Sequence, residues 1–358
     1  MAAAPVTPGT PFRPQAASVR LVDVTKRFGT VGAVNNLTLE IPRGMLVTLL
    51  GPSGCGKTTT LRIIAGLEIP TRGKVFIEDE DMTPVPAAHR HVTMVFQSYA
   101  LFPHLTVFEN VAFGLRLARR PEAEIRRDVQ WALEVVGLAG VEQRYPGKLS
   151  GGQQQRVSLA RALVMKPSVI LFDEPLSNLD AKLQKRVRVE IRDLQQRLGI
   201  TAVYVTHDQA EALAISDIVV VMNEWRVEQI GSPEDLHRRP ANRFVADFVG
   251  EANFLPVTYR EGVVMAGPYR FAYRQEGRAT GDWMLLVRPE AVRLDRGDEG
   301  LVGTIHAAAF LGSHTEYLVE TPLGTLLAVG PADRTGARGV GAPVTLQFES
   351  GGVYLLPR

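Results

Sequence analysis

The chain has 358 residues, enough for about two or three domains and a sizeable core. Forty Lys and Arg against 38 Asp and Glu give a formal net charge of +2, which argues against a polycationic nucleic-acid binder. The single cysteine, Cys55, excludes an intramolecular disulfide framework and fits a reducing compartment. Apolar runs such as 218–222 are far shorter than the roughly 18 residues that a membrane-spanning helix needs.

The N-terminal segment 1–17 contains four prolines and no continuous apolar stretch. This composition is typical of a disordered tail and not of a secretory signal peptide. We therefore expect the folded part of the chain to begin at about residue 18.

Strand-like and helical patterns alternate over residues 18–250, which predicts an α/β domain with a mainly parallel sheet. Candidate strands lie at 45–50, 93–96, 169–172, 201–205 and 218–222. Helical patterns lie at 59–65, 122–136 and 153–165. Because residues 98–166 are mostly helical in pattern, we expect a helical insertion there.

Residues 251–358 have a different pattern, with short apolar runs separated by Gly and Pro. Candidate strands lie at 284–288, 301–305, 316–319, 325–329 and 344–348. These signals predict a small all-β, OB-like barrel. The region holds ten Arg, no Lys and twelve acidic residues, so we expect no nucleic-acid partner for it.

Residues 51–58 read Gly-Pro-Ser-Gly-Cys-Gly-Lys-Thr between a predicted strand and a predicted helix. This is the pattern of a phosphate-binding P-loop, in which backbone N–H groups and a helix N-terminus surround the phosphates. Lys57 is expected to neutralise the β- and γ-phosphates, and the Thr58 hydroxyl to bind Mg²⁺. The candidate nucleotide-binding residues are Gly51, Ser53, Gly54, Cys55, Gly56, Lys57, Thr58 and Thr59.

Two carboxylates, Asp173 and Glu174, follow the apolar run 169–172. At the carboxyl end of a parallel strand, Asp173 can reach a Mg²⁺ ion and Glu174 can polarise the attacking water. An acidic pair of this kind also fits a solvated turn or a helix cap. The P-loop elsewhere in the chain favours the catalytic interpretation.

Residues 149–153 read Leu-Ser-Gly-Gly-Gln and precede a predicted helix. Ser150 fits a plain N-cap with a flexible lead-in. Gly151 and Gly152 also expose backbone N–H groups at the helix N-terminus, where an anion can bind. One bound phosphate chain needs only one such helix N-terminus from a single subunit, and the P-loop already provides it.

From residue 19 to about residue 249 the chain resembles the ATP-binding subunit of an ABC transporter. The matching segments follow the family's order: 51–59 for Walker A, Gln97 for the Q-loop, 149–156 for the signature, 169–174 for Walker B, 177–180 for the D-loop and His207 for the H-loop. In that family the signature of one subunit closes on the ATP held by the other. The resemblance implies that Ser150, Gly151 and Gly152 act in this way.

The resemblance also implies roles for single residues. Phe28 would stack on adenine, although Tyr is commoner in the family and a loop Phe is often core. Gln97 would contact Mg²⁺ or the attacking water, and His207 the γ-phosphate. Asp180 would shape the dimer contact, with a simple turn carboxylate as the alternative. Trp225 stands where relatives usually have Gly, which leaves the local turn type open.

Residues 101–108 are unusually apolar for the start of a helical insertion. Part of this segment fits buried core. The resemblance implies that the rest lines a groove for a short helix of a membrane-spanning partner.

Residues 229–233, 244–254 and 287–290 resemble the barrel-bearing ATP subunits of bacterial importers for ferric iron, polyamines, sulfate and sugars. The expected fold is thus a P-loop ABC ATPase domain with a helical insertion, at 18–250, followed by a regulatory OB-like barrel, at 251–358. The expected solute is ferric iron, with polyamine, sulfate, phosphonate and sugar as alternatives.

The resemblance implies an ATPase that uses ATP and Mg²⁺ at the cytoplasmic face of the inner membrane. Its expected partners are a second copy of itself, two integral membrane permease subunits and, indirectly, a periplasmic solute-binding protein. The alternatives are a soluble ABC ATPase of translation or DNA repair and a nucleotide-dependent binding module. The single P-loop and the acidic barrel argue against these two alternatives.

Overall fold

The computed structural model describes residues 16–267, 269–295, 300–332 and 339–358. The expected tail at 1–17 lies outside the described residues up to residue 15. Ala17, however, is buried, and its carbonyl accepts a hydrogen bond of 2.6 Å from the Thr201 hydroxyl. This bond ties Ala17 to a strand of the central sheet.

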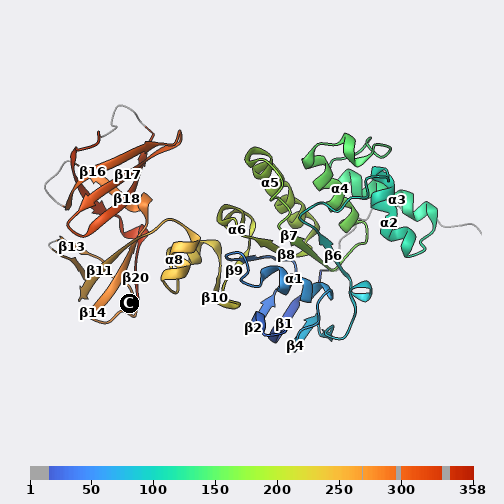
Figure 1. Cartoon of the computed structure of the whole chain (residues 1–358), viewed down its shortest axis with the longest axis horizontal. Helices are drawn as coiled ribbons and strands as arrows, with labels where there is room; N and C mark the ends of the chain where they lie inside the picture. Colours follow the sequence, from blue (N-terminus) through green and yellow to red (C-terminus); the bar gives the residue numbers. More distant parts are fainter. Residues whose placement is uncertain (1–15, 268, 296–299, 333–338) are drawn as a thin grey trace, which may run out of the picture. The chain divides into compact units, whose positions relative to one another are not determined.

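A six-stranded sheet forms the centre of the first domain (Figure 1). Its order is β10 (Arg226–Gly231), β9 (Ile218–Asn223), β3 (Leu46–Leu50), β8 (Thr201–Thr206), β7 (Val169–Asp173) and β6 (Val92–Val95). All its pairings are parallel except that of β10 with β9. Five of these strands are those predicted from the sequence.

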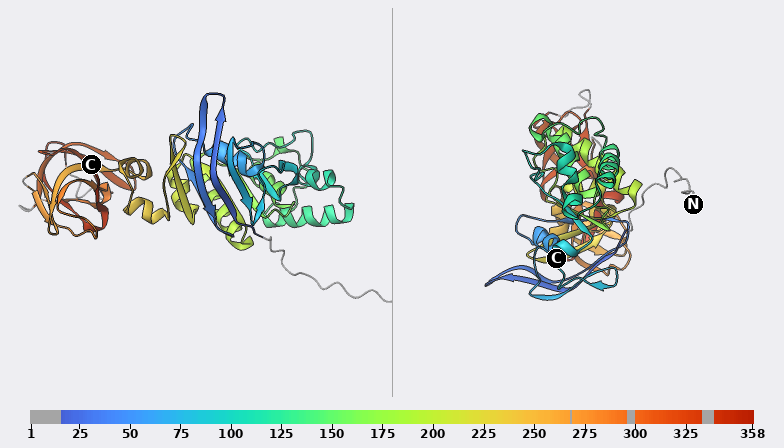
Figure 2. Two further views of the ribbon diagram at one scale, coloured as in Figure 1. Left: turned by 90° about the horizontal axis from the view of Figure 1, so that it is seen from below. Right: turned by 90° about the vertical axis from the view of Figure 1, so that its right-hand side faces the viewer.

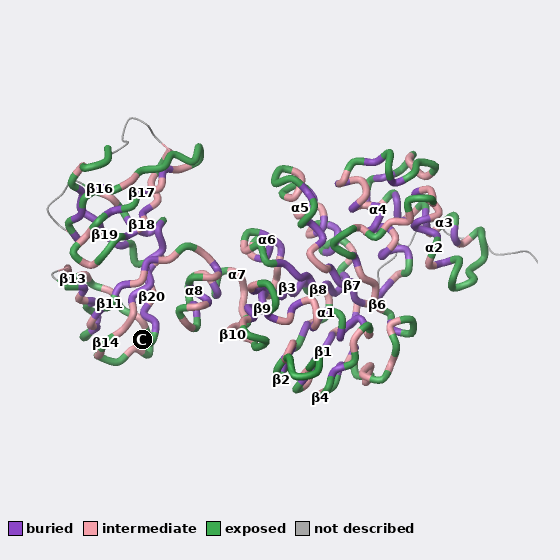
Figure 3. The backbone as a smooth tube through the Cα atoms, viewed as in Figure 1, coloured by how far each residue is buried: buried purple, intermediate pink, exposed green. Residues whose placement is uncertain are grey.

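The central strands are apolar because both faces of the sheet are covered. Every residue of β3 and β8 is buried, as the purple tube in Figure 3 shows. The surrounding helices are α1 (Lys57–Ala65), α5 (Ala181–Leu198) and α6 (Gln209–Ile215). The sheet therefore holds the loops at its carboxyl edge in fixed positions.

A second, antiparallel sheet was not predicted. Its order is β2 (Val31–Ile41), β1 (Val19–Phe28), β4 (Arg72–Ile77) and β5 (Glu80–Asp81), and the left view of Figure 2 shows the long β1–β2 pair. One hydrophobic core includes residues of this sheet, of α1 and of the central sheet. The helix that follows the P-loop is thereby packed into a core that both sheets share.

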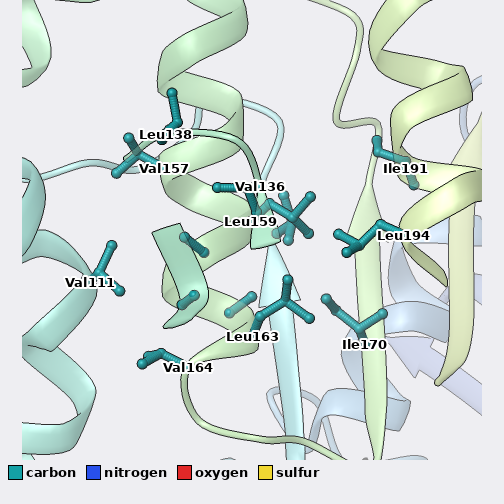
Figure 4. Packing of buried hydrophobic residues seen from close by; sticks show 14 of the residues in the cluster. Val111, Val136, Leu138, Val157, Leu159, Leu163, Val164, Ile170, Ile191 and Leu194 are labelled. Atoms are coloured by element: carbon teal, nitrogen blue, oxygen red, sulfur yellow. The ribbon is translucent and has the colours of Figure 1, made fainter. Parts of the chain in front are cut away.

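The predicted helical insertion at 98–166 consists of α2 (Val107–Leu117), α3 (Glu122–Val135) and α4 (Gly151–Leu163). Figure 4 shows its core, in which Val111 of α2 and Val157, Leu159 and Leu163 of α4 belong to the same buried cluster as Ile170 of β7. The N-terminus of α2 is closed by a capping box between Thr106 and Glu109. Short 3₁₀ turns lie at Ala87–His89 and Pro146–Lys148.

The second domain is all-antiparallel. One sheet has the order β13 (Tyr269–Ala272), β12 (Val263–Ala266), β11 (Asn253–Arg260), β14 (Gly281–Val287) and β20 (Val353–Leu356). The other has the order β15 (Val292–Asp295), β19 (Pro343–Phe348), β16 (Leu301–Phe310), β17 (His314–Thr321) and β18 (Gly324–Pro331). Both sheets contribute to one core, which makes the predicted small OB-like barrel. Two further 3₁₀ turns lie at Pro289–Ala291 and Ser350–Gly352.

The compact units are Met1–Pro233 and Glu234–Arg358, so they divide earlier than the expected boundary at 250/251. The region before that boundary contains α7 (Pro233–Arg238) and α8 (Arg243–Val249). Buried Arg288 donates hydrogen bonds to the carbonyls of His237 and Ala246, and also to those of Gly250 and Glu251. These bonds explain why this segment groups with the barrel.

Among the described residues, no helix combines the length and the apolar composition needed to cross a bilayer.

Candidate active site

The P-loop lies between β3 and α1, where two of its glycines are packed against backbone. A Cβ on Gly51 would lie 2.3 Å from the Met222 carbonyl oxygen, and one on Gly56 would lie 2.3 Å from that of Ala33. No larger residue fits at either position without moving a strand. Sequence and packing therefore require glycine at both positions.

The N-terminus of α1 differs from those of α2, α4, α5 and α6. Each of those helices has a side-chain cap, whereas the N-cap of α1 is Gly56, which offers none. No side chain therefore caps the backbone N–H groups of the first turn of α1. An anion is the acceptor that the helix dipole favours there.

Lys57 places its charge at the P-loop. Its side chain is only 5% exposed, and Nζ donates to the carbonyl oxygens of Gly51 and Pro52, both at 2.8 Å. A buried ammonium beside these uncapped N–H groups can attract and neutralise a phosphate chain. The neighbouring Cys55 is buried as well, and this burial raises the pKa of its thiol.

Thr58 and Asp173 meet although they are far apart in the sequence. The Thr58 hydroxyl donates to Asp173 Oδ1 at 3.2 Å, and burial raises the pKa of the carboxyl. A hydroxyl and a carboxylate oxygen fit Mg²⁺, which prefers oxygen ligands and keeps water or phosphate oxygens in its shell. Within the described ranges, no group of three or more His, Cys, Asp or Glu is placed so that it could hold a metal ion.

Glu174 and His207 form the second pair at the carboxyl edge of the sheet. Glu174 Oε2 lies 3.1 Å from His207 Nδ1, and β7 and β8, which precede the two residues, are neighbours. The backbone of Glu174 is left-handed, with φ of 44°, and its N–H donates to Val205 O at 3.1 Å. Both side chains line a small pocket of about 120 Å³. A carboxylate held in this way can accept a proton from water.

Gln97 follows β6 and is held through its backbone. Its carbonyl accepts a hydrogen bond of 2.9 Å from Asn178 Nδ2. The next turn contains two left-handed residues, Tyr99 and Ala100, and both of their carbonyls accept bonds from Arg161 of α4. Neither Asn178 nor Arg161 was predicted from the sequence as a site residue. Only Asn178 carried a signal, because it lies inside the motif at 177–180.

The signature residues lie apart from these groups. Ser150 is exposed, and its hydroxyl caps α4 in a box with Gln153. Gly152 faces Leu183 of α5. Among the described residues, no hydrogen bond joins the signature to the P-loop or to the two carboxylates.

Asp180 and Phe28 have simpler surroundings. Asp180 is the N-cap of α5 and accepts a bond of 3.0 Å from Leu183 N. The Phe28 ring is 49% exposed at the end of β1, with Lys26 Nζ 4.7 Å from its centroid. An exposed ring of this kind can stack on a planar ligand.

Comparisons with known proteins find relatives for both parts of the chain. The model of the ABC transporter family matches residues 34–177, and that of the TOBE domain matches residues 285–356. The "Fe(3+) ions import ATP-binding protein FbpC" of Agrobacterium fabrum is 50% identical over 345 residues, covering 95% of this chain and 98% of that protein. The protein of the same name from Escherichia coli K12 is 52% identical over 303 residues, covering 84% of this chain and 87% of that protein.

Solved structures resemble the first domain. A dimeric post-hydrolysis state of the ATP-binding cassette MJ0796, bound to ADP and Pi, matches with a TM-score of 0.53 at 33% identity, covering 60% of this chain and 98% of that one. Clostridium perfringens cbiO1, part of an ABC transporter complex, matches with a TM-score of 0.57 at 28% identity, covering 64% of this chain and 92% of that one.

Proposed function

Because this chain belongs to the ABC transporter family and is one of its ATP-binding import subunits, we propose that it hydrolyses ATP to drive the uptake of ferric iron. The observation that supports iron as the solute is the match to an Fe(3+) import protein at 50% identity over 95% of the chain, barrel included. Polyamine, sulfate, phosphonate and sugar are the alternative solutes.

The proposed reaction is phosphoryl transfer from ATP to water. Lys57 and the N–H groups of α1 would bind the β- and γ-phosphates, while Phe28 would stack on adenine. Glu174, held by His207, would take the proton of the attacking water. Thr58 and Asp173, with Gln97, would hold Mg²⁺, which would supply charge neutralisation for the phosphate oxygens.

We also propose that two copies of the chain complete two composite sites. The sequence contains one P-loop and one signature, and Ser150 at the N-terminus of α4 is exposed. An exposed helix N-terminus can bind the γ-phosphate of ATP held by a second copy. The dimeric state of the similar cassette MJ0796 supports this proposal.

The segment before α2 supports docking to two integral membrane permease subunits at the cytoplasmic face of the inner membrane. Phe102 is half-buried, and its ring centroid lies 4.7 Å from that of Phe113, which is 44% exposed. Buried Asn110 fixes this segment by hydrogen bonds to Phe102, Leu105 and Thr106. A rigid, partly exposed apolar surface of this kind suits a short helix of a membrane partner.

The test is transport in proteoliposomes that contain this chain and its permeases. With the iron-loaded periplasmic solute-binding protein outside and ATP inside, we expect radioactive iron to accumulate, and to fail to do so with the Glu174→Gln variant. Uptake of a polyamine, sulfate, phosphonate or sugar instead would reject iron and keep the ATPase role. Failure to recover any integral membrane protein with the chain from detergent extracts would reject the transport role itself.

A further inference from the structure

The turn between β9 and β10 is strained and contains the tryptophan that the sequence analysis singled out. Asn223 pairs with Arg226, so Glu224 and Trp225 form a two-residue hairpin loop. Their φ angles of 44° and 66° are those of a type I′ turn, which favours Asn and Gly. A bulky residue with a left-handed backbone needs a compensating interaction.

The Trp225 side chain makes that interaction with the P-loop. Its indole Nε1 donates a hydrogen bond of 3.1 Å to the carbonyl oxygen of Gly54. The six-membered ring lies over Gly32 of β2, where a Cβ would be 3.5 Å from Cε3. The Trp225 carbonyl accepts a bond of 2.9 Å from Asn35 N. The turn thus ties the P-loop to β2.

The bond to Gly54 fixes one peptide unit of the loop. In a trans peptide the carbonyl of Gly54 and the N–H of Cys55 point in opposite directions. When the indole holds the carbonyl, the Cys55 N–H is directed toward the other side. There it donates a long hydrogen bond of 3.4 Å to Pro52 O, which a phosphate oxygen can replace. That N–H belongs to the set that surrounds the phosphates of a bound nucleotide.

We propose that Trp225 is a positioning residue of the ATP site, which holds the Gly54–Cys55 peptide in its phosphate-binding orientation through the indole N–H. This inference rests on the proposed binding of ATP at the P-loop. The ring itself lies over β2, so the effect reaches the phosphates and not the base. Trp225 is 39% exposed, and stacking on adenine is the alternative that the test must separate.

The chain offers a matched control. Trp283, in the barrel, also donates its indole N–H to a backbone carbonyl, that of Ala279, at 3.1 Å. Trp225→Phe and Trp283→Phe therefore remove the same kind of bond, and only the first touches the P-loop. Trp225→Gly is the third variant, because glycine accepts a φ of 66° without strain and should keep the turn folded.

Binding is measured by the fluorescence anisotropy of an N-methylanthraniloyl ATP analogue, with ATP and inorganic tripolyphosphate as competitors. We expect Trp225→Phe and Trp225→Gly to lower the affinity for both competitors by about three- to tenfold, the range expected for one lost hydrogen bond. We expect Trp283→Phe to match the wild type. If the affinity for ATP falls and the affinity for tripolyphosphate does not, Trp225 acts on the base and the proposal is wrong.

Alkylation of buried Cys55 supplies a readout that does not depend on nucleotide. A loosened P-loop should open more often, so labelling of nucleotide-free Trp225→Phe by iodoacetamide should be at least about threefold faster than that of Trp283→Phe. Equal labelling and equal competitor affinities in the two variants would overturn the proposal. Failure of the wild type to bind ATP would instead reject the proposed function.

Discussion

Asp173 and Glu174 are adjacent in the sequence but have different partners. Asp173 accepts a hydrogen bond from Thr58 beside the P-loop, whereas Glu174 faces His207 across the ends of β7 and β8. The left-handed backbone of Glu174 turns its side chain away from the line of the strand. One residue is therefore suited to a metal ion and the other to the attacking water.

Replacement of Glu174 by Gln should separate ATP binding from hydrolysis. The amide keeps the size of the side chain but cannot take a proton, so we expect the ATPase rate to fall about 100-fold or more while ATP affinity is kept. Glu122→Gln is the control, because Glu122 pairs with Arg126 on α3, outside the site. Phosphate release measures the rates. Hydrolysis by Glu174→Gln at near the wild-type rate would show that another group is the base.

The pH dependence of Cys55 alkylation follows from its burial, which raises the pKa of the thiol. Since only the thiolate reacts, the folded protein should label more slowly than an ordinary thiol at neutral pH. Its rate should go on rising at pH values where a free thiol is already ionised. The same protein in urea is the reference, and Mg-ATP should slow the labelling further. Identical pH profiles for folded and unfolded protein would contradict this prediction.

At the scale of elements, the sequence predicted the parallel strands because β3, β7, β8 and β9 are nearly continuous apolar runs. The antiparallel sheet was missed because β1 and β2 mix polar and apolar residues and their pairing shifts register three times. The P-loop and Asp173–Glu174 could be located because their motifs are local. The bond from Trp225 to Gly54 could not, because it joins residues 171 positions apart.

Arg288 is the clearest long-range contact within the barrel unit. Its guanidinium is buried and donates to four backbone carbonyls of the segment around α7 and α8. Arg288→Met should leave these carbonyls without a donor and lower the free energy of unfolding of this unit by about 3 kcal/mol or more. Arg260→Met, at an exposed position, is the control. An unchanged midpoint of urea unfolding, followed by the fluorescence of Trp283, would contradict this stabilising role of Arg288.

For the whole molecule, the contact with Arg288 bears on where the ATPase domain can be cut. A chain that ends at residue 250 keeps α8 but lacks the barrel. Because Ala246 of α8 packs against Leu286 and Leu356 of the barrel, this chain would expose an apolar face of α8. A chain that ends at residue 233 removes it. We expect both truncated chains to bind ATP, and the longer one to aggregate more in light scattering. Loss of ATP binding in a folded 1–233 chain would argue against the proposed division.

The shared composite site is the most demanding prediction at this scale, and the structure decides which signature residue can test it. Substitution of Gly152 is a less direct test, because a Cβ there would lie 3.0 Å from Leu183 Cδ1, so the Leu183 side chain of the same chain would have to shift. Ser150 is exposed, and Asp can replace it as the N-cap of α4. Ser150→Asp should thus keep the helix while it places a carboxylate against the γ-phosphate held by the partner.

Lys57→Ala should lose ATP affinity in its own subunit, and Ser150→Asp should bind ATP as a monomer but fail to close a dimer. In a mixed dimer, one site carries both defects, whereas the other combines an intact P-loop with an intact signature. ATP-dependent cross-linking of differently tagged subunits should therefore recover closed dimers that neither variant forms alone. If Ser150→Asp abolishes ATP binding by the isolated monomer, the signature acts within its own chain, and the proposal of a composite site is wrong.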